Sequence, residues 1–210
     1  MKPLSVGKSL ILLRLDEFKC VEKNPAMLSY RITKYNPALR NSDGSYLDDS
    51  EWTSISDIGK EKYNKPTFQE YEYVENAYVK TVQLILNKND IRSLEIDSLE
   101  QYNTGQDFIN YKKSGELNYM SVEFESDIKL LKDSTEIDST CIEKYVRLIL
   151  REVIWMKLIS EDFELSFGYD YYMYIKCPDL TPEMIIAIEQ LGLFVEPGIE
   201  PTTFEFILEE

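Results

Sequence analysis

Short segments in which apolar and polar residues alternate recur along this chain of 210 residues. Such alternation is typical of antiparallel strands that have one face in the core and the other in water. It predicts strands at 9–22, 29–35, 52–55, 94–96, 120–124, 193–195 and 203–207, and a hairpin over 163–175 that turns at 168–170. The sheet is therefore expected to be mostly antiparallel.

Two longer helices are predicted where a capping box precedes apolar residues with a helical period. The first box is Thr67 with Glu70. The second is Thr140 with Glu143, and its helix is expected to continue to about residue 159. The expected buried faces are Tyr71, Val74, Tyr78, Val82 and Ile85 in the first helix, and Ile142, Val146, Ile149, Val153 and Met156 in the second.

The irregular order of strands and helices predicts an α+β fold with two longer helices and one short helix. The short helix is expected to begin at Thr181 and Pro182. The length of the chain fits a single domain over residues 1–210. A division into two lobes is a candidate near 100–118, where the residues are typical of a loop, as they are at 133–138.

The charge of the chain restricts its partners. Twenty-three Lys and Arg against 38 Asp and Glu give a net charge of −15, and there is no histidine. This charge repels free nucleic acid and anionic membranes, and it steers the protein toward basic surfaces. The alternative is that the acidity serves solubility alone.

A cytoplasmic location is expected. No segment reaches the roughly 20 apolar residues of a membrane span. The apolar run at 10–13 is short, and Arg14 and Asp16 interrupt it before any cleavage site of a signal peptide.

No cofactor and no metal ion are expected. Residues 7–9 (Gly-Lys-Ser) resemble the end of a phosphate-binding loop, but Lys2 stands where that motif needs a glycine. A calcium loop around Gly44 would place Leu39 at its first ligand position, and leucine cannot coordinate the ion. Phosphate binding at 7–9 is therefore not expected. The segment around Gly44 is interpreted as a solvated acidic turn, and an adventitious weak cation site is the alternative.

The chain is not expected to be an enzyme. Without histidine, Ser-His-Asp and Cys-His chemistry and the commonest general base are excluded. Among 38 carboxylates, no pair is marked by its sequence context as a catalytic couple. The three cysteines, Cys20, Cys141 and Cys177, are far apart and are expected to be reduced and mostly buried.

The tyrosine-rich end of the predicted hairpin is a candidate binding surface. On a strand, Tyr171 and Met173 would face one side, and Tyr172 and Tyr174 the other, with one set in the core. Exposed tyrosines beside carboxylates suit a basic protein surface, whereas a central strand would bury both sets. The candidate partner-binding residues on an acidic turn and on this hairpin are Asp43, Asp48, Asp49, Glu51, Asp162, Asp170, Tyr172 and Tyr174.

Three segments in the first half of the chain resemble a known group of proteins. They are 30–37 (YRITKYNP), 51–59 (EWTSISDIG) and 73–78 (YVENAY). They resemble cytosolic immunity proteins that accompany bacterial polymorphic toxins of the contact-dependent growth inhibition type. The resemblance implies a protein that binds its cognate toxin domain, often a nuclease, and blocks it. It assigns no role to individual residues.

Two other functional classes stay open. One is a carboxylate-based hydrolase or nucleotide-processing enzyme. The other is an acidic protein that mimics DNA and thereby occupies an enzyme that binds nucleic acid.

Overall fold

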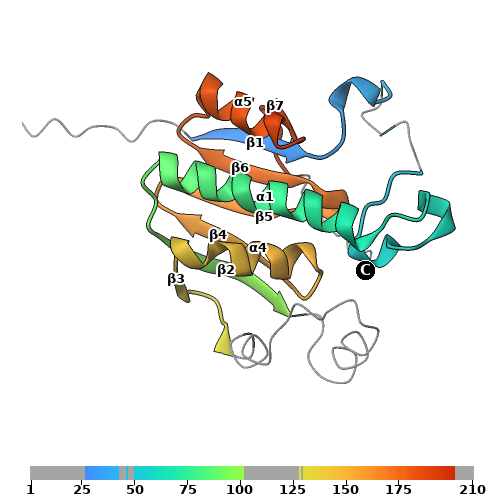
Figure 1. Ribbon diagram of the computed structural model, residues 1–210. Coiled ribbons are helices and arrows are strands. Elements are labelled where there is room, and N and C mark those ends of the chain that lie inside the picture. Colours follow the sequence, from blue (N-terminus) through green and yellow to red (C-terminus); the bar gives the residue numbers. More distant parts are fainter. Residues whose placement is uncertain (1–26, 43–45, 47–49, 102–127, 129, 202–210) are drawn as a thin grey trace, which may run out of the picture.

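The described part of the chain forms an α+β fold around one antiparallel sheet (Figure 1). The computed structural model describes residues 27–42, 46, 50–101, 128 and 130–201. In this part the sheet has seven strands in the order β3-β2-β4-β5-β6-β1-β7, and all neighbouring strands are antiparallel. The strands are β1 (Leu28–Thr33), β2 (Ser93–Gln101), β3 (Glu136–Asp138), β4 (Ile154–Ser160), β5 (Phe163–Phe167), β6 (Met173–Cys177) and β7 (Phe194–Pro197). The predicted fold class is confirmed.

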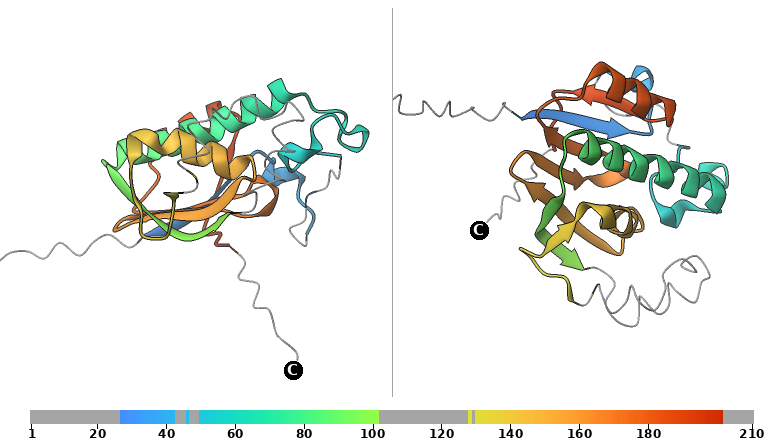
Figure 2. Two further views of the ribbon diagram at one scale, coloured as in Figure 1. Left: turned by 90° about the horizontal axis from the view of Figure 1, so that it is seen from below. Right: turned by 60° about the vertical axis from the view of Figure 1, so that its left-hand side comes forward.

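The helices lie against one face of this sheet. Figure 2 shows α1 and α4 on the same side of the strands, and α5 contacts both α1 and β7. The α-helices are α1 (Phe68–Lys88), α4 (Ile142–Leu150) and α5 (Pro182–Gln190). Short 3₁₀ turns connect the elements: η1 (Pro37–Leu39), η2 (Ile55–Asp57), η3 (Glu61–Tyr63), η4 (Ser139–Cys141) and η5 (Tyr169–Tyr171).

Alternation along the strands separates a covered face from an open one. In β4, Met156 is buried and Lys157 is half-buried, and in β6 the same holds for Ile175 and Tyr174. Because successive side chains of a strand point to opposite faces, the buried set lies under the helices. None of the described α-helices covers the other face, named here the open face (Figure 2).

The N-terminus of α1 forms as its sequence predicts. Thr67 accepts a hydrogen bond from the backbone N–H of Glu70, and the Glu70 carboxylate accepts one from the backbone N–H of Thr67. Each bond satisfies an amide that has no partner within the helix. Of the predicted buried face, Tyr71, Tyr78, Val82 and Ile85 are buried, and Val74 packs against the core while partly exposed.

The prediction for the second helix is wrong at both ends. Thr140 does not cap α4; its backbone N–H and hydroxyl donate to Asp138, which caps the 3₁₀ turn η4. The helix ends at Leu150, and Glu152 takes a φ of 56° in the turn that follows. The apolar residues from Ile154 onward form strand β4, because they alternate and so bury one side of a strand in the core.

The remaining predicted elements are confirmed in part. Residues 52–55 form no strand and lead into η2, whereas 133–138 contains the short strand β3. The hairpin, the strands near 29–35, 94–96 and 193–195, and the helix that Thr181 caps are confirmed. The predicted strands at 9–22, 120–124 and 203–207, and nearly all of the candidate division at 100–118, lie outside the described residues.

The two described cysteines have different environments. Cys177 is free and buried, and burial raises the pKa of its thiol to about 12. Cys141 is free but exposed at the start of α4, so the expectation of burial is wrong for this residue. Cys20 lies outside the described residues.

Candidate functional site

A cleft lies near the end of β1 and the connection between β5 and β6. Figure 1 shows where these elements lie in the sheet. The cleft has a volume of about 220 Å³ and is lined by residues of the loop after β1, of η3 and of the β5–β6 connection. Its lining residues are Tyr35, Tyr46, Glu51, Thr53, Lys62, Tyr63, Asp170 and Tyr172. Four of these are tyrosines, so we name it the tyrosine cleft.

Buried aromatic rings support the cleft from the core side. Trp52 and Tyr171 alternate in sequence with cleft residues but are themselves buried. Their ring centroids are 5.3 Å apart at 82°, and Tyr71 of α1 lies 5.7 Å from Trp52 and 6.1 Å from Tyr171. The two pairs of Tyr171 are edge-to-face, and such pairs each contribute about 0.5–1.5 kcal/mol beyond the burial of their area. The cleft therefore has a rigid base.

The β5–β6 connection holds an unusual backbone conformation. Asp170 and Tyr171 have φ values of 60° and 61°. Aspartate tolerates this left-handed region, but a bulky residue such as tyrosine adopts it rarely, at a cost of about 1–3 kcal/mol. The conformation directs Tyr171 into the core while Asp170 stays exposed at the cleft.

Three hydrogen bonds fix this connection. The Tyr171 hydroxyl donates to the Leu150 carbonyl at 2.9 Å, and the Tyr78 hydroxyl donates to the Tyr171 carbonyl at 2.5 Å. The Gly168 amide donates to the Tyr172 carbonyl at 2.8 Å. These bonds offset the strain at Tyr171, so the backbone that carries Asp170 is held in place.

Lys34, at the end of β1, places its ammonium group against aromatic rings. Its side chain is 5% exposed, and Nζ lies 3.7 Å from the ring centroid of Trp52 and 4.6 Å from that of Tyr35. Nζ also forms an ion pair with Oε1 of Glu51. Burial lowers the pKa of Lys34, and the interaction with Glu51 opposes that shift. The wall of the cleft thus already contains one bound cation.

Tyr172 is fixed between the cleft and two arginines. Its hydroxyl accepts a hydrogen bond from Nη1 of Arg40 at 3.0 Å, and the Arg31 guanidinium lies 4.8 Å from its ring centroid. Both arginines bind Glu196 of β7. Burial raises the pKa of Glu196, but the hydrogen bonds and charges of Arg31 and Arg40 together outweigh it and hold that pKa below its usual value. The Tyr172 ring also lies 5.7 Å from that of Tyr35.

Asp57 organises the segment that carries Glu51 and Thr53. This buried carboxylate accepts a hydrogen bond from the Thr53 amide at 3.0 Å. Its Oδ1 also forms an ion pair with Nζ of Lys60 at 3.0 Å. Burial alone would raise the pKa of Asp57, yet the bonds from Thr53 and Lys60 hold it below its usual value. The ionised form therefore stabilises the folded chain.

This ionisation predicts a dependence of stability on pH. The pKa of Asp57 is lower in the folded state than in the unfolded state. Ionised Asp57 therefore adds to the free energy of unfolding above the unfolded pKa near 3.8, and this stabilisation is lost as the pH falls through the folded pKa. At pH 7, Asp57→Asn should lower the free energy of unfolding by about 1–3 kcal/mol. The difference from the unchanged protein should shrink below pH 3.8. Urea unfolding between pH 3 and pH 7 measures it.

Glu61→Gln provides the control, since Glu61 is exposed in the same region. It should change stability by less than about 0.5 kcal/mol at every pH. A loss in Asp57→Asn that stays constant across the series would contradict the ionic role of Asp57.

The structure brings together three of the eight predicted partner-binding residues. Glu51, Asp170 and Tyr172 all line the tyrosine cleft, although Glu51 was assigned to a different surface from the other two. Asp162 lies in the β4–β5 turn, at the opposite end of the hairpin. Tyr172 and Tyr174 are both half-buried. The other candidates, Asp43, Asp48 and Asp49, lie outside the described residues.

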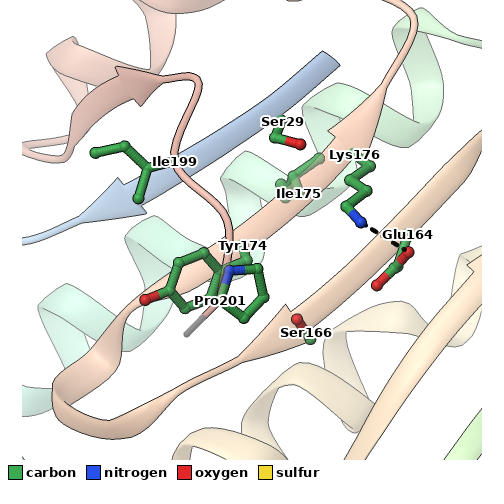
Figure 3. Close-up of a pocket in the computed structure, with 8 residues that line it drawn as sticks. All are labelled: Ser29, Glu164, Ser166, Tyr174, Ile175, Lys176, Ile199 and Pro201. Carbon is green, nitrogen blue, oxygen red and sulfur yellow. Dashed lines mark ion pairs between the residues drawn. The ribbon is translucent and has the colours of Figure 1, made fainter. Parts of the chain in front are cut away.

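Tyr174 faces a second, much smaller pocket on the open face of the sheet. Figure 3 shows it beside Pro201, with Ser29, Ser166 and the ion pair of Glu164 and Lys176 around it. This pocket measures about 10 Å³, which is at the lower limit for one water molecule. It is therefore too small to hold a ligand.

Sequence reasoning missed most of the cleft. Tyr35, Tyr46 and Tyr63 are spread over the long connection between β1 and α1, and no spacing in the sequence indicates that they meet. The feature of the sequence that pointed to such a site was the high number of tyrosines, 15. A surplus of tyrosine favours a binding surface but does not place it.

Within the described ranges, no group of three or more Cys, Asp or Glu side chains is arranged to hold a metal ion. No helix among those residues is both long enough and apolar enough to cross a membrane. No protein-family model matches the chain, and no curated protein and no solved structure is significantly similar to it.

Proposed function

We propose that this protein binds a partner protein at the tyrosine cleft and thereby neutralises it, as the immunity protein of a bacterial toxin. The observation that carries the proposal is the cleft itself. Four tyrosines with two carboxylates, Glu51 and Asp170, surround a volume of about 220 Å³ on a rigid aromatic base. The resemblance of three N-terminal segments to immunity proteins supplies the class of partner.

Tyrosine suits such a role because it buries a large area at little cost in side-chain entropy and keeps a polar hydroxyl. Residues of this type, in a preformed and partly enclosed position, commonly dominate binding energy. The surrounding charge favours a basic partner, since the chain carries a net charge of −15. A toxin domain that binds nucleic acid has a basic surface of this kind.

The test uses the C-terminal domain encoded by the gene immediately upstream. We expect it to form a complex with this protein and to lose its toxic activity in that complex. The double variant Asp170→Asn/Tyr172→Ala removes one carboxylate and one ring from the cleft. It should weaken the complex at least about 30-fold, the effect of roughly 2 kcal/mol for a binding hot spot.

Asp162→Asn/Tyr174→Ala is the matched control, because it makes the same chemical changes on the same hairpin but outside the cleft. It should bind like the unchanged protein. If loss of the Tyr172 ring disturbs folding, the single variant Asp170→Asn still tests the cleft, because it keeps that ring. Equal losses in both double variants would contradict a role for the cleft, and the absence of any complex would contradict the immunity function.

A further inference from the structure

We infer that the tyrosine cleft receives one arginine side chain of the partner, with its guanidinium group stacked on tyrosine rings and paired with Asp170. The inference rests on the proposed function and deepens it by naming the chemical group that is recognised. It is carried by three observations: a cation bound beside the cleft, a carboxylate in the cleft that has no partner among the described residues, and the tyrosine rings that line it.

Lys34 shows which cation chemistry this region supports. Its ammonium is held by the face of Trp52, the face of Tyr35 and a carboxylate oxygen of Glu51. Tyr35 and Glu51 also line the cleft. Attraction between a cation and an aromatic face strengthens where water is excluded. Tyr35 and Glu51 therefore contact a cation on one side and border the cleft on the other.

Asp170 is the carboxylate available for that second cation. Glu51 is already paired with Lys34, whereas Asp170 is exposed and makes no hydrogen bond or ion pair with any described residue. Its backbone is held by the strained connection, so it cannot move away to find a partner in the loop. An incoming cation would therefore pair with Asp170 without first breaking another bond.

The walls favour guanidinium over ammonium. Tyr35, Tyr46 and Tyr172 line the cleft as one group of rings, with Tyr35 5.0 Å from Tyr46 and 5.7 Å from Tyr172. The Tyr172 ring already holds two guanidinium groups, those of Arg31 at 4.8 Å and Arg40 at 5.3 Å. Arginine is planar, stacks on aromatic faces and is more weakly hydrated than lysine. An ammonium keeps more of its hydration and gains less from such a site.

The positive charge of Lys62 should weaken the binding of an arginine, and this effect can be tested. It lines the cleft, its Nζ donates to the Tyr63 hydroxyl at 3.2 Å, and it lies 4.7 Å from the centre of that ring. As a like charge, it opposes entry of an arginine. Removing the charge of Lys62 should therefore strengthen binding, the opposite of the change at Asp170.

The experiment titrates the full-length protein with acetyl-Gly-Arg-Gly-amide and follows tyrosine ring signals by NMR. We expect a dissociation constant on the order of millimolar, as suits one side chain. The lysine peptide should bind more weakly, and the citrulline peptide, which keeps the shape without the charge, should not bind. Asp170→Asn should weaken arginine binding about tenfold. Asparagine also tolerates the left-handed backbone, so the fold is kept.

Asp162→Asn is the control for a general change in charge and should leave binding unchanged. Lys62→Gln should tighten binding, whereas Lys65→Gln, exposed next to the same 3₁₀ turn, should not. Equal binding of the arginine and citrulline peptides, or equal effects of the two aspartate variants, would overturn the inference.

The two proposals fail separately. If the peptide does not bind while the upstream toxin domain still forms a cleft-dependent complex, the arginine inference is wrong and the proposed function stands. If the peptide binds with the expected selectivity while no toxin domain forms a complex, the immunity function is wrong and the arginine pocket stands.

Discussion

Glu75→Gln will lower the free energy of unfolding by about 3–5 kcal/mol. Glu75 lies in α1 with 0% of its surface exposed. Arg151, which is 4% exposed, donates from Nε to Oε1 at 2.5 Å and from Nη2 to Oε2 at 2.6 Å. Arg147 of α4 donates to Oε2 as well. Glutamine would remove the buried negative charge that both guanidinium groups share. Arg147 keeps its pair with Glu143, whereas Arg151 is almost fully enclosed.

The Glu75 cluster joins α1 to the C-terminal end of α4. Burial lowers the pKa of Arg151, but the hydrogen bond and charge of Glu75 outweigh this and raise it above the ordinary value. The Tyr71 hydroxyl also donates to Glu75 at 3.3 Å, which connects the cluster to the aromatic base of the cleft. Replacing Glu75 should therefore weaken the packing of both α1 and α4.

Urea unfolding of two further variants tests this reasoning. Glu143→Gln removes the other carboxylate bound to Arg147, but Glu143 is 51% exposed, so it should cost less than about 0.5 kcal/mol. Replacing the whole cluster by Glu75→Leu/Arg147→Met/Arg151→Met should cost less than Glu75→Gln, because no buried charge remains unpaired. Similar losses in Glu75→Gln and Glu143→Gln would contradict the buried role of Glu75.

The second large effect concerns the rate at which the toxin domain associates. With a net charge of −15, association with a basic partner should be about 10 to 1,000 times faster at low salt than without steering. The Debye length falls from about 30 Å at 0.01 M to about 8 Å at physiological ionic strength. The association rate should therefore fall steeply over this range, whereas the dissociation rate should change little.

Stopped-flow kinetics across a salt series measures both rates. Asp170→Asn should slow association, and Tyr172→Ala should speed dissociation, because the ring forms short-range contacts only after encounter. Asp162→Asn is the matched control for the charge change. An association rate that does not depend on salt would show that the acidity serves solubility alone.

Local signals in the sequence were sufficient for most elements of the described fold. The capping box at Thr67 and the period of α1 are satisfied within one stretch of chain. Alternation in 163–175 likewise specifies a hairpin without reference to distant residues. Such predictions succeed because the partners involved are only a few residues apart.

The error in the second helix shows where local signals end. Residues 142–159 contain apolar residues that fit a helical period, but from Ile154 they also alternate. The choice between helix and strand was made by β2 and β5, which pair with β4 on either side. Pairing with other strands, one of them the distant β2, decided the structure of this segment, and its own sequence allowed either outcome.

The sequence by itself determined the charge, the absence of histidine, the antiparallel α+β class and the surplus of tyrosine. Only the tertiary structure decided that Glu51, from the loop after β1, lies in one cleft with Asp170 and Tyr172 of the hairpin. It also placed Tyr174, two residues after Tyr172, outside that cleft. The physical reason is that strand pairing and helix burial set the distance between loops, and neither is written in the residues of the loops themselves.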